Sequence, residues 1–153
     1  MKKALINVLF ILICLLTYSF TALINEQEWI NWGNKCLAEA YDPTAEPLLK
    51  KFEITLTPDH FIRLKKTYQQ GKQEYFSFHL QQFAGFTYLP GTANTNTLQL
   101  QTIADDIIVQ TYQDPKGDVD SMTTTLNIPV KKTTAARLDS LKEALLFLKG
   151  KGL

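Results

Sequence analysis

Residues 74–82 read EYFSFHLQQ, and this stretch decides the fold class. Its apolar residues Phe76, Phe78 and Leu80 recur at every second position, with polar residues between them. Alternation with a period of two places one set of side chains on one face of a β-strand, so the segment predicts a half-buried strand. A strand with one apolar and one polar face is typical of an antiparallel sheet that meets water on one side.

The preceding segment, residues 58–68, fits two structures. Thr57-Pro58-Asp59 is a typical helix start, whereas Ile62 and Leu64 alternate with polar residues as in a strand. We predict a strand, because residues 69–72 (QQGK) have the composition of a hairpin turn that leads into the strand after it.

Alternation elsewhere in the chain predicts further strands. They cover residues 52–57, 85–89, 97–102, 106–112 and 122–128, so that all strands fall within residues 48–130. The sequence DPKGD at residues 114–118 combines proline, glycine and aspartate, which is typical of a turn between two of these strands.

An amphipathic helix is predicted on each side of the strands. Asn25 can cap the first helix, Glu28 completes a capping box, and Asp42-Pro43 ends it, which gives a helix over residues 25–41. The second helix is predicted over residues 133–149, with four leucines at helical spacing and glycines just after its end.

The order of these elements predicts an α+β fold. It is an antiparallel meander of six or seven strands, with the N-terminal and the C-terminal helix packed on the sheet. Seven strands followed by a helix resembles the pleckstrin-homology-like roll in element order, over residues 48–149. A one-layer roll of helices on a sheet is the alternative. Residues 23–153 have the length of one ordinary domain.

The N-terminus has the three parts of a secretory leader. Met1-Lys2-Lys3 precedes an uncharged run to residue 25, which is apolar first and then rich in small residues. This pattern predicts a signal peptide over residues 1–22. The alternative is an uncleaved membrane anchor over residues 4–24, since about 20 apolar residues suffice to cross a bilayer. Both predict export to the periplasm or the exterior, with membrane attachment only if the leader is retained.

The charge balance argues against a nucleic-acid partner. The chain has 16 basic and 15 acidic residues, and two of the basic ones are in the leader. The rest of the chain is therefore close to neutral, without the basic surface that nucleic-acid binding needs. We interpret the lysine pairs at 50–51, 65–66 and 131–132 as charges that keep the edges of elements soluble.

Cysteine and histidine give no typical metal or catalytic pattern. Cys36 is the one cysteine beyond the leader, and we interpret it as a small apolar residue on the face of the first helix. If the hairpin turns about residues 70–71, His79 lies opposite Ile62 and His60 lies opposite Gln81. We interpret both histidines as surface residues, and we expect no cofactor.

Three aspartates form the densest acidic cluster in the chain. Asp114, Asp118 and Asp120 lie in and just after a turn, and carboxylates on a turn are candidate calcium ligands. The spacing differs from that of the EF-hand loop, and aspartate is also favoured in turns for local hydrogen bonding. Calcium is therefore a minor candidate here.

Aromatic residues after the central strand are the most suggestive functional feature. Phe83, Phe86 and Tyr88 stand next to the predicted loop at residues 90–96, so they are candidates for a ligand or partner surface. No nucleophile elbow, phosphate loop or zinc motif is present in the sequence.

These features together favour a small exported, non-catalytic binding or accessory protein. We expect it to meet a protein of the cell envelope through a sheet edge or through the region 83–96. An inhibitor or immunity protein of an exported toxin is one concrete form of this hypothesis. A carrier that encloses a small apolar ligand between sheet and helices is the alternative, and a hydrolase with an unrecognised site is a third.

Overall fold

The computed structural model describes residues 26–91 and 96–152. The predicted leader and the capping residue Asn25 lie outside these ranges, as do residues 92–95 of the loop. Within the described ranges, no helix is long and apolar enough to cross a membrane.

In the described part of the chain, two α-helices flank eight strands. The N-terminal helix covers residues 26–40 of the described chain, and α2 covers Ala135–Lys149. Between them come the short helix η1 (Pro43–Ala45), β1 (Leu49–Leu56), β2 (Phe61–Tyr68), β3 (Gln73–His79), the short helix η2 (Leu80–Gln82), β4 (Phe83–Leu89), β5 (Asn96–Thr102), β6 (Ile107–Tyr112), β7 (Asp120–Thr123) and β8 (Thr125–Val130). The predicted α+β class, with a helix at each end of an antiparallel strand region, is confirmed.

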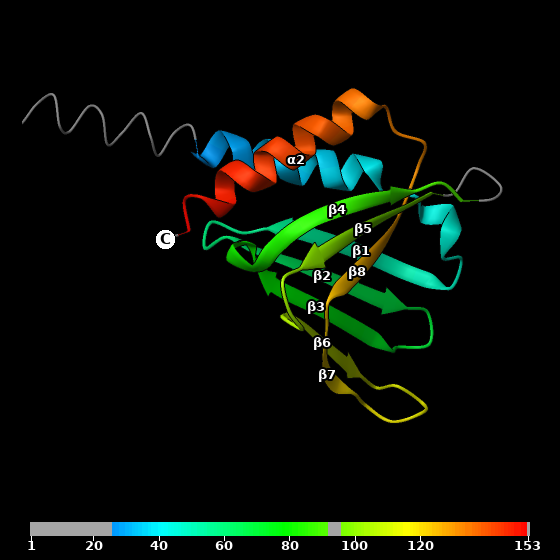
Figure 1. Cartoon of the computed structure of the whole chain (residues 1–153). Coiled ribbons are helices and arrows are strands. Elements are labelled where there is room, and N and C mark those ends of the chain that lie inside the picture. The colour runs from blue at the N-terminus through cyan, green and yellow to red at the C-terminus, as the bar shows by residue number, and fades with distance from the viewer. Residues whose placement is uncertain (1–25, 92–95, 153) are drawn as a thin grey trace, which may run out of the picture.

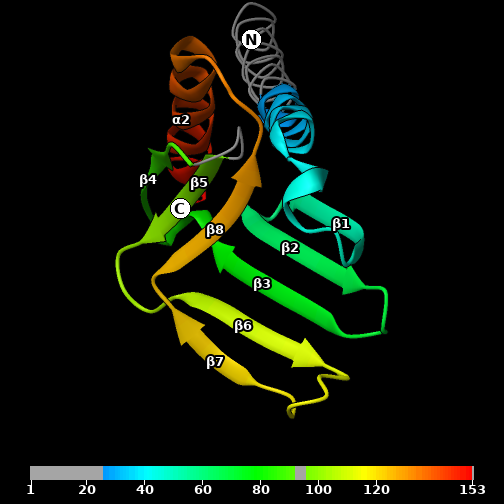
Figure 2. The same cartoon turned by 90° about the vertical axis from the view of Figure 1, so that its right-hand side faces the viewer.

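The strands form two antiparallel sheets in place of one meander. One sheet has the order β1-β2-β3-β6-β7, and the other has the order β4-β5-β8. The pairs β3–β6 and β5–β8 join strands that are not neighbours in the sequence, which a simple meander does not contain. Figure 1 shows the two helices together on one side of the strands, and Figure 2 shows the β1–β2–β3–β6–β7 sheet extending away from them.

The chain changes sheet at two short breaks that the alternation pattern did not predict. The strand expected over residues 74–82 ends at His79, whose ring Nδ1 accepts the N–H of Gln81 at 3.2 Å and so caps η2. The strand expected over residues 122–128 is interrupted at Thr124, which separates β7 from β8. In both segments the alternation of apolar and polar residues continues across the break, so the alternation alone does not indicate where the strand ends.

The β2–β3 hairpin confirms the strand prediction for residues 61–68. Its register differs by one residue from the expected one, because His79 pairs with Phe61 and not with Ile62. The turn contains Gly71 at φ +96°, a conformation that side chains rarely adopt. His60, just before β2, also has a positive φ of 59° and belongs to the turn, not to the strand.

The helices bury their apolar stripes against the strands. The core joins residues of the N-terminal helix, the strands and α2, among them Ile30, Cys36, Leu37, Leu56, Ile62, Phe78, Phe83, Leu100, Leu141, Leu145 and Leu148. The leucine stripe expected in the C-terminal helix is therefore confirmed. Gly33 lets the N-terminal helix approach β1 closely, since a Cβ there would lie 3.1 Å from Leu56 Cδ2.

Candidate partner-binding site

Strand β1, at one edge of the larger sheet, is protected from pairing with another chain. It carries Lys50, Lys51 and Glu53, and charged side chains oppose edge-to-edge association. At its end, the amide of Asn34 donates to Leu56 O at 2.9 Å and accepts from Leu56 N at 2.6 Å. The outward backbone groups of Leu56 are thus already satisfied by the N-terminal helix.

Two further edge strands are also poorly suited to pair with another chain. Strand β7 has four residues only, which is too short to hold an added strand well. The outer side of β8 is covered near its end by the segment after the N-terminal helix. Asp42 N donates to Pro129 O at 3.0 Å, and Lys131 N donates to Ala40 O at 2.8 Å.

Strand β4 differs from these edges in its length and its lack of charge. It has seven residues, pairs with β5 on one side, and contains no charged side chain. Thr87 and Leu89 are exposed, and Leu89 keeps 42% of its surface in contact with solvent. At the start of β4 the backbone carbonyl of Phe83 is already occupied, because it accepts a hydrogen bond from Lys149 Nζ at 2.7 Å. A long uncharged edge strand is a template for strand addition.

The three aromatic candidates of this region have different positions. Phe83 is fully buried in the core, so it is not available to a partner surface. Phe86 and Tyr88 are partly buried and pack against the same core. The surface that β4 offers is consequently its backbone edge together with Thr87 and Leu89. The alternation did not reveal this, because a register shift between Phe83 and Gly85 changes which residues face inward.

The far end of β4 touches the segment that leads into α2. The hydroxyl of Tyr88 lies 3.5 Å from the backbone N of Thr133, so the two segments meet although 45 residues separate them. In Figure 1 the end of β4 and the connection from β8 to α2 lie at the same end of the molecule.

Two surface hollows continue from this contact along the helices. The first has a volume of ≈ 240 Å³ and is lined by Lys131, Lys132, Thr133, Thr134, Glu39 and Arg137. The second, of ≈ 410 Å³, lies between the two helices and is lined by Trp32, Lys35, Cys36, Ala136, Ser140 and again Arg137. Glu39 and Arg137 line both hollows, so the two hollows adjoin at this ion pair, and together we call them the interhelix groove.

Arg137 and Glu39 stand at the middle of the interhelix groove. A guanidinium Nη of Arg137 donates to the Glu39 carboxylate, and its Nε lies 3.4 Å from Cys36 Sγ. The bond to Arg137 holds the pKa of Glu39 below its usual value, and the bond to Glu39 raises the pKa of Arg137. Cys36 is buried beneath this pair.

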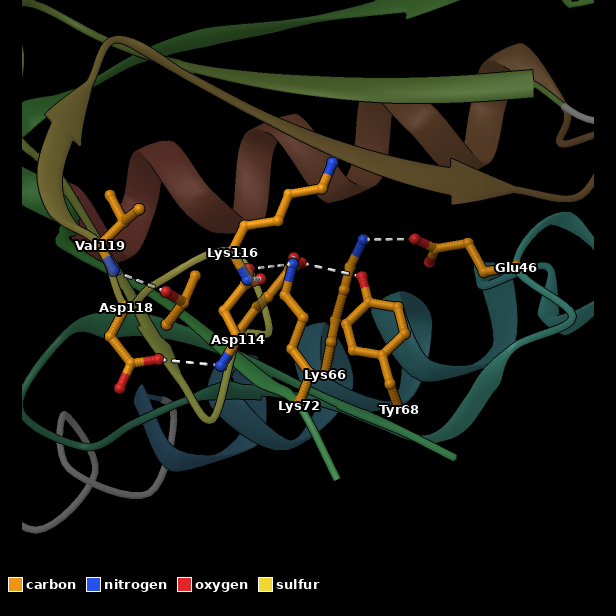
Figure 3. Close-up of polar contacts among 10 residues, drawn as sticks. Glu46, Lys66, Tyr68, Lys72, Asp114, Lys116, Asp118 and Val119 are labelled. Carbon is orange, nitrogen blue, oxygen red and sulfur yellow. Dashed lines mark hydrogen bonds and ion pairs between the residues drawn. The ribbon is translucent and has the colours of Figure 1, made fainter. Parts of the chain in front are cut away.

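Asp114 belongs to an ion-pair network and is not an open ligand (Figure 3). Lys72 Nζ lies 2.7 Å from Asp114 Oδ2 and 2.8 Å from Glu74 Oε1, and the Tyr68 hydroxyl donates to Glu74 at 2.9 Å. The hydrogen bond from Lys72 lowers the pKa of Asp114. Burial and the bond to Glu74 raise the pKa of Tyr68.

The three calcium candidates do not converge. Asp118 Oδ1 accepts the backbone N–H of Asp114 at 2.9 Å, and Asp114 Oδ1 accepts that of Lys116 at 2.9 Å. Asp120 lies in β7, where it pairs with Gln110. Among the described residues, no three histidine, cysteine or acidic side chains are grouped so that they could hold a metal ion.

The interpretation of Lys66 as a solubilising edge residue is wrong. Lys66 lies on the inward face of β2 with 8% of its surface exposed. It follows Ile62 and Leu64 at every second position, so its side chain is on the same face of the strand as theirs. Its Nζ donates to Glu46 Oε1 at 2.7 Å, as Figure 3 shows. The other carboxylate oxygen of Glu46 is buried without a hydrogen-bond partner in the structure.

The surface interpretation is also wrong for His60. Its side chain is buried and its Nε2 lies 2.9 Å from Glu26 Oε1 on the N-terminal helix. The centroid of its ring lies 6.4 Å from that of His79, which remains partly exposed. His60 has a positive φ in the turn before β2, and neither this turn geometry nor the contact with Glu26 is visible in the alternation of the strand.

Comparison with known proteins finds no matching family model, curated protein or solved structure.

Proposed function

We propose that this chain is a non-catalytic binding protein that receives an extended segment of a protein partner along the free edge of β4. The observation that carries the proposal is the difference in charge, length and cover between the edge strands of the two sheets. β1 is charged, β7 is short and β8 is covered near its end, whereas β4 has seven uncharged residues and pairs with β5 on one side only. Proteins normally protect such an edge, and an unprotected one is the starting point of β-augmentation.

The packing of the interior supports partner binding over the carrier hypothesis. Phe78, Phe83 and Leu80 are 0–1% exposed and belong to one core cluster with residues of the strands and of both helices. A carrier of a small apolar ligand would need a cavity of at least about 300 Å³ there. Large aromatic side chains in that position favour a filled core.

The expected export places the partner in the cell envelope or outside the cell. An inhibitor or immunity protein of an exported toxin is a concrete form of the same proposal, because such a protein needs an interface and no catalytic site. In both forms the backbone edge of β4 supplies hydrogen bonds, and Thr87 and Leu89 select the side chains of the incoming segment.

The test compares two lysine substitutions on directly opposed residues. Thr87→Lys places a charge on the β4 edge strand, and Gln99→Lys places the same charge on its cross-strand partner in β5. The full chain carrying an affinity tag is used to capture partners from the envelope fraction of its own cells. We expect Thr87→Lys to reduce the recovery of the partner about tenfold or more, and Gln99→Lys to leave it within about twofold.

Hydrogen exchange on the captured complex then locates the contact. Amides of residues 85–89 are expected to exchange more slowly in the complex than in the free protein. Equal loss of recovery in both variants, or slower exchange confined to another segment, would refute strand addition at β4.

A further inference from the structure

We infer that the partner segment carries acidic residues beside its β4-paired part, and that these residues bind in the interhelix groove. This inference rests on the proposed function, and it specifies the chemistry of the partner. It follows from three features of the groove: its position, its charge and its shape.

The position of the groove continues the edge of β4. Tyr88, the next-to-last residue of β4, lies 3.5 Å from the backbone N of Thr133 through its hydroxyl. Thr133 lines the smaller hollow of the groove. A chain that pairs along β4 and leaves near Leu89 would therefore emerge close to the basic end of the groove.

The charge of the groove is strongly unbalanced. Four cationic side chains, Lys35, Lys131, Lys132 and Arg137, line the two hollows, against the single carboxylate of Glu39. The chain as a whole has a formal net charge of only +1. The first turn of α2, which opens beside the smaller hollow, contains no acidic residue, so its positive dipole end adds to the field. Such a surface attracts carboxylates.

Glu39 shows how a carboxylate is held in this groove. Its carboxylate accepts from Arg137, and its Oε1 lies 3.9 Å from Lys35 Nζ. Both partners are on the surface, so an incoming carboxylate can compete with Glu39 for Arg137. Lys131 and Lys132 are exposed at the other side of Arg137 and have no acidic neighbour in the hollow besides Glu39.

The shape of the groove suits a peptide more than an isolated anion. The larger hollow, of ≈ 410 Å³, is walled by Trp32, Ala136 and Cys36 as well as by cations, so it accepts an apolar side chain. The smaller hollow, of ≈ 240 Å³, offers lysines and threonine hydroxyls to a carboxylate. A peptide that carries both kinds of side chain fills both hollows, whereas inorganic phosphate would use the cations alone.

Trp32 provides a built-in reporter for the test. Its side chain lines the larger hollow and is 36% exposed, whereas Trp29, the other tryptophan, packs against Phe147. The purified full chain is titrated with hexaglutamate and, as a neutral probe, hexaglutamine. Salt is kept near 10 mM, where the Debye length is about 30 Å. We expect a saturable change in tryptophan fluorescence with hexaglutamate only, and its loss in Trp32→Phe.

Four charge variants test the assignment of the groove. Arg137→Gln and Lys131→Gln are expected to weaken hexaglutamate binding about tenfold and fivefold. Glu39→Gln is expected to strengthen it several-fold by removing the internal competitor. Lys142→Gln is the matched control, because Lys142 is exposed on α2 but does not line either hollow, and it should leave the affinity unchanged.

Several results would overturn the inference. They are the absence of saturable binding, an equal loss in Lys142→Gln, and displacement of hexaglutamate by equimolar inorganic phosphate, which would make the groove a phosphate site.

Partner capture separates this inference from the proposed function. If Arg137→Gln leaves partner recovery intact while residues 85–89 remain protected, the acidic segment is refuted and strand addition stands. If Thr87→Lys and Gln99→Lys reduce partner recovery equally, strand addition at β4 is refuted. Hexaglutamate binding would then show an acidic-peptide site, but it would not support a partner segment that also pairs with β4.

Discussion

Lys66 donates to Glu46 from the inward face of β2, across a distance of 2.7 Å, while the second carboxylate oxygen of Glu46 is buried without a partner. A buried ion pair contributes little net stability, because removing both charges from water costs about as much as their attraction returns. Removing one partner is different, since the remaining charge then stays buried and unpaired. This asymmetry makes a quantitative prediction.

Glu46→Gln should lower the free energy of unfolding by about 2 kcal/mol, because it leaves the ammonium of Lys66 without a counter-charge. Adding Lys66→Met to Glu46→Gln should recover at least half of this loss. Urea denaturation of both single variants and the double variant gives the coupling energy. Additive losses in the double variant would show that the pair is not coupled.

The ion-pair network around Asp114 predicts a change in stability at acid pH. The hydrogen bond from Lys72 holds the pKa of Asp114 below the usual value of an aspartate. A carboxyl group with a depressed folded-state pKa adds stability that is complete above its unfolded pKa and is lost as the pH falls through the folded pKa. The contribution of Asp114 should therefore begin to decline near the usual aspartate pKa of about 3.9 and be lost at more acid pH.

Asp114→Asn is the variant that tests this pH dependence. It should be less stable than the native protein at pH 6 and should lose less stability between pH 5 and pH 3. Denaturant midpoints measured across that range check the expectation. Asp139→Asn, at an exposed position of α2, is the control and should follow the native curve. Parallel curves for Asp114→Asn and native protein would contradict the role of Asp114.

The sequence predicted the strands well and the sheet order poorly. Alternation is a local property, and it correctly located apolar faces such as that of Phe76 and Phe78. Which strands pair is decided by contacts far apart in the chain, such as those of β3 with β6 and of β5 with β8. The edge position of β4, on which the candidate site depends, follows from that order and was not readable from its own residues.

The interhelix groove was hidden for a similar reason. Arg137 and Glu39 are 98 residues apart, and only the packing of the two helices brings them together. The sequence alone indicates ordinary solubilising charges at Lys131 and Lys132. A pair of lysines next to a helix start is common on surfaces, so their partners across the groove had to be seen before a role could be assigned.

Two glycines that end or turn elements should respond differently to alanine. Gly71 has φ +96° in the β2–β3 turn, and a Cβ there would lie 3.2 Å from Gln113 Oε1. Gly71→Ala should cost about 1 kcal/mol or more, because alanine is strained at positive φ. Gly150 ends α2 at φ −71°, where a Cβ makes ordinary contacts, so Gly150→Ala should be neutral or slightly stabilising. Equal thermal denaturation midpoints for the two variants would contradict this prediction.

The amide of Asn34 links the N-terminal helix to the protection of β1. Because it bonds both the N–H and the C=O of Leu56, Asn34→Ala should lower the free energy of unfolding by about 2 kcal/mol. Asn31→Ala, on the exposed side of the same helix, should change it by less than about 0.5 kcal/mol. The amide of Leu56 should also exchange faster with solvent in Asn34→Ala.

Asn34→Ala also tests whether the protection of β1 prevents this edge from pairing with another chain. If the proposed strand addition selects β4 because β1 is protected, opening β1 at Leu56 should create a second weak pairing site. Asn34→Ala should then show concentration-dependent self-association by analytical ultracentrifugation, while Asn31→Ala stays like the native protein. A destabilised Asn34→Ala protein that remains monomeric would mean that Lys50, Lys51 and Glu53 suffice to guard β1 without the amide.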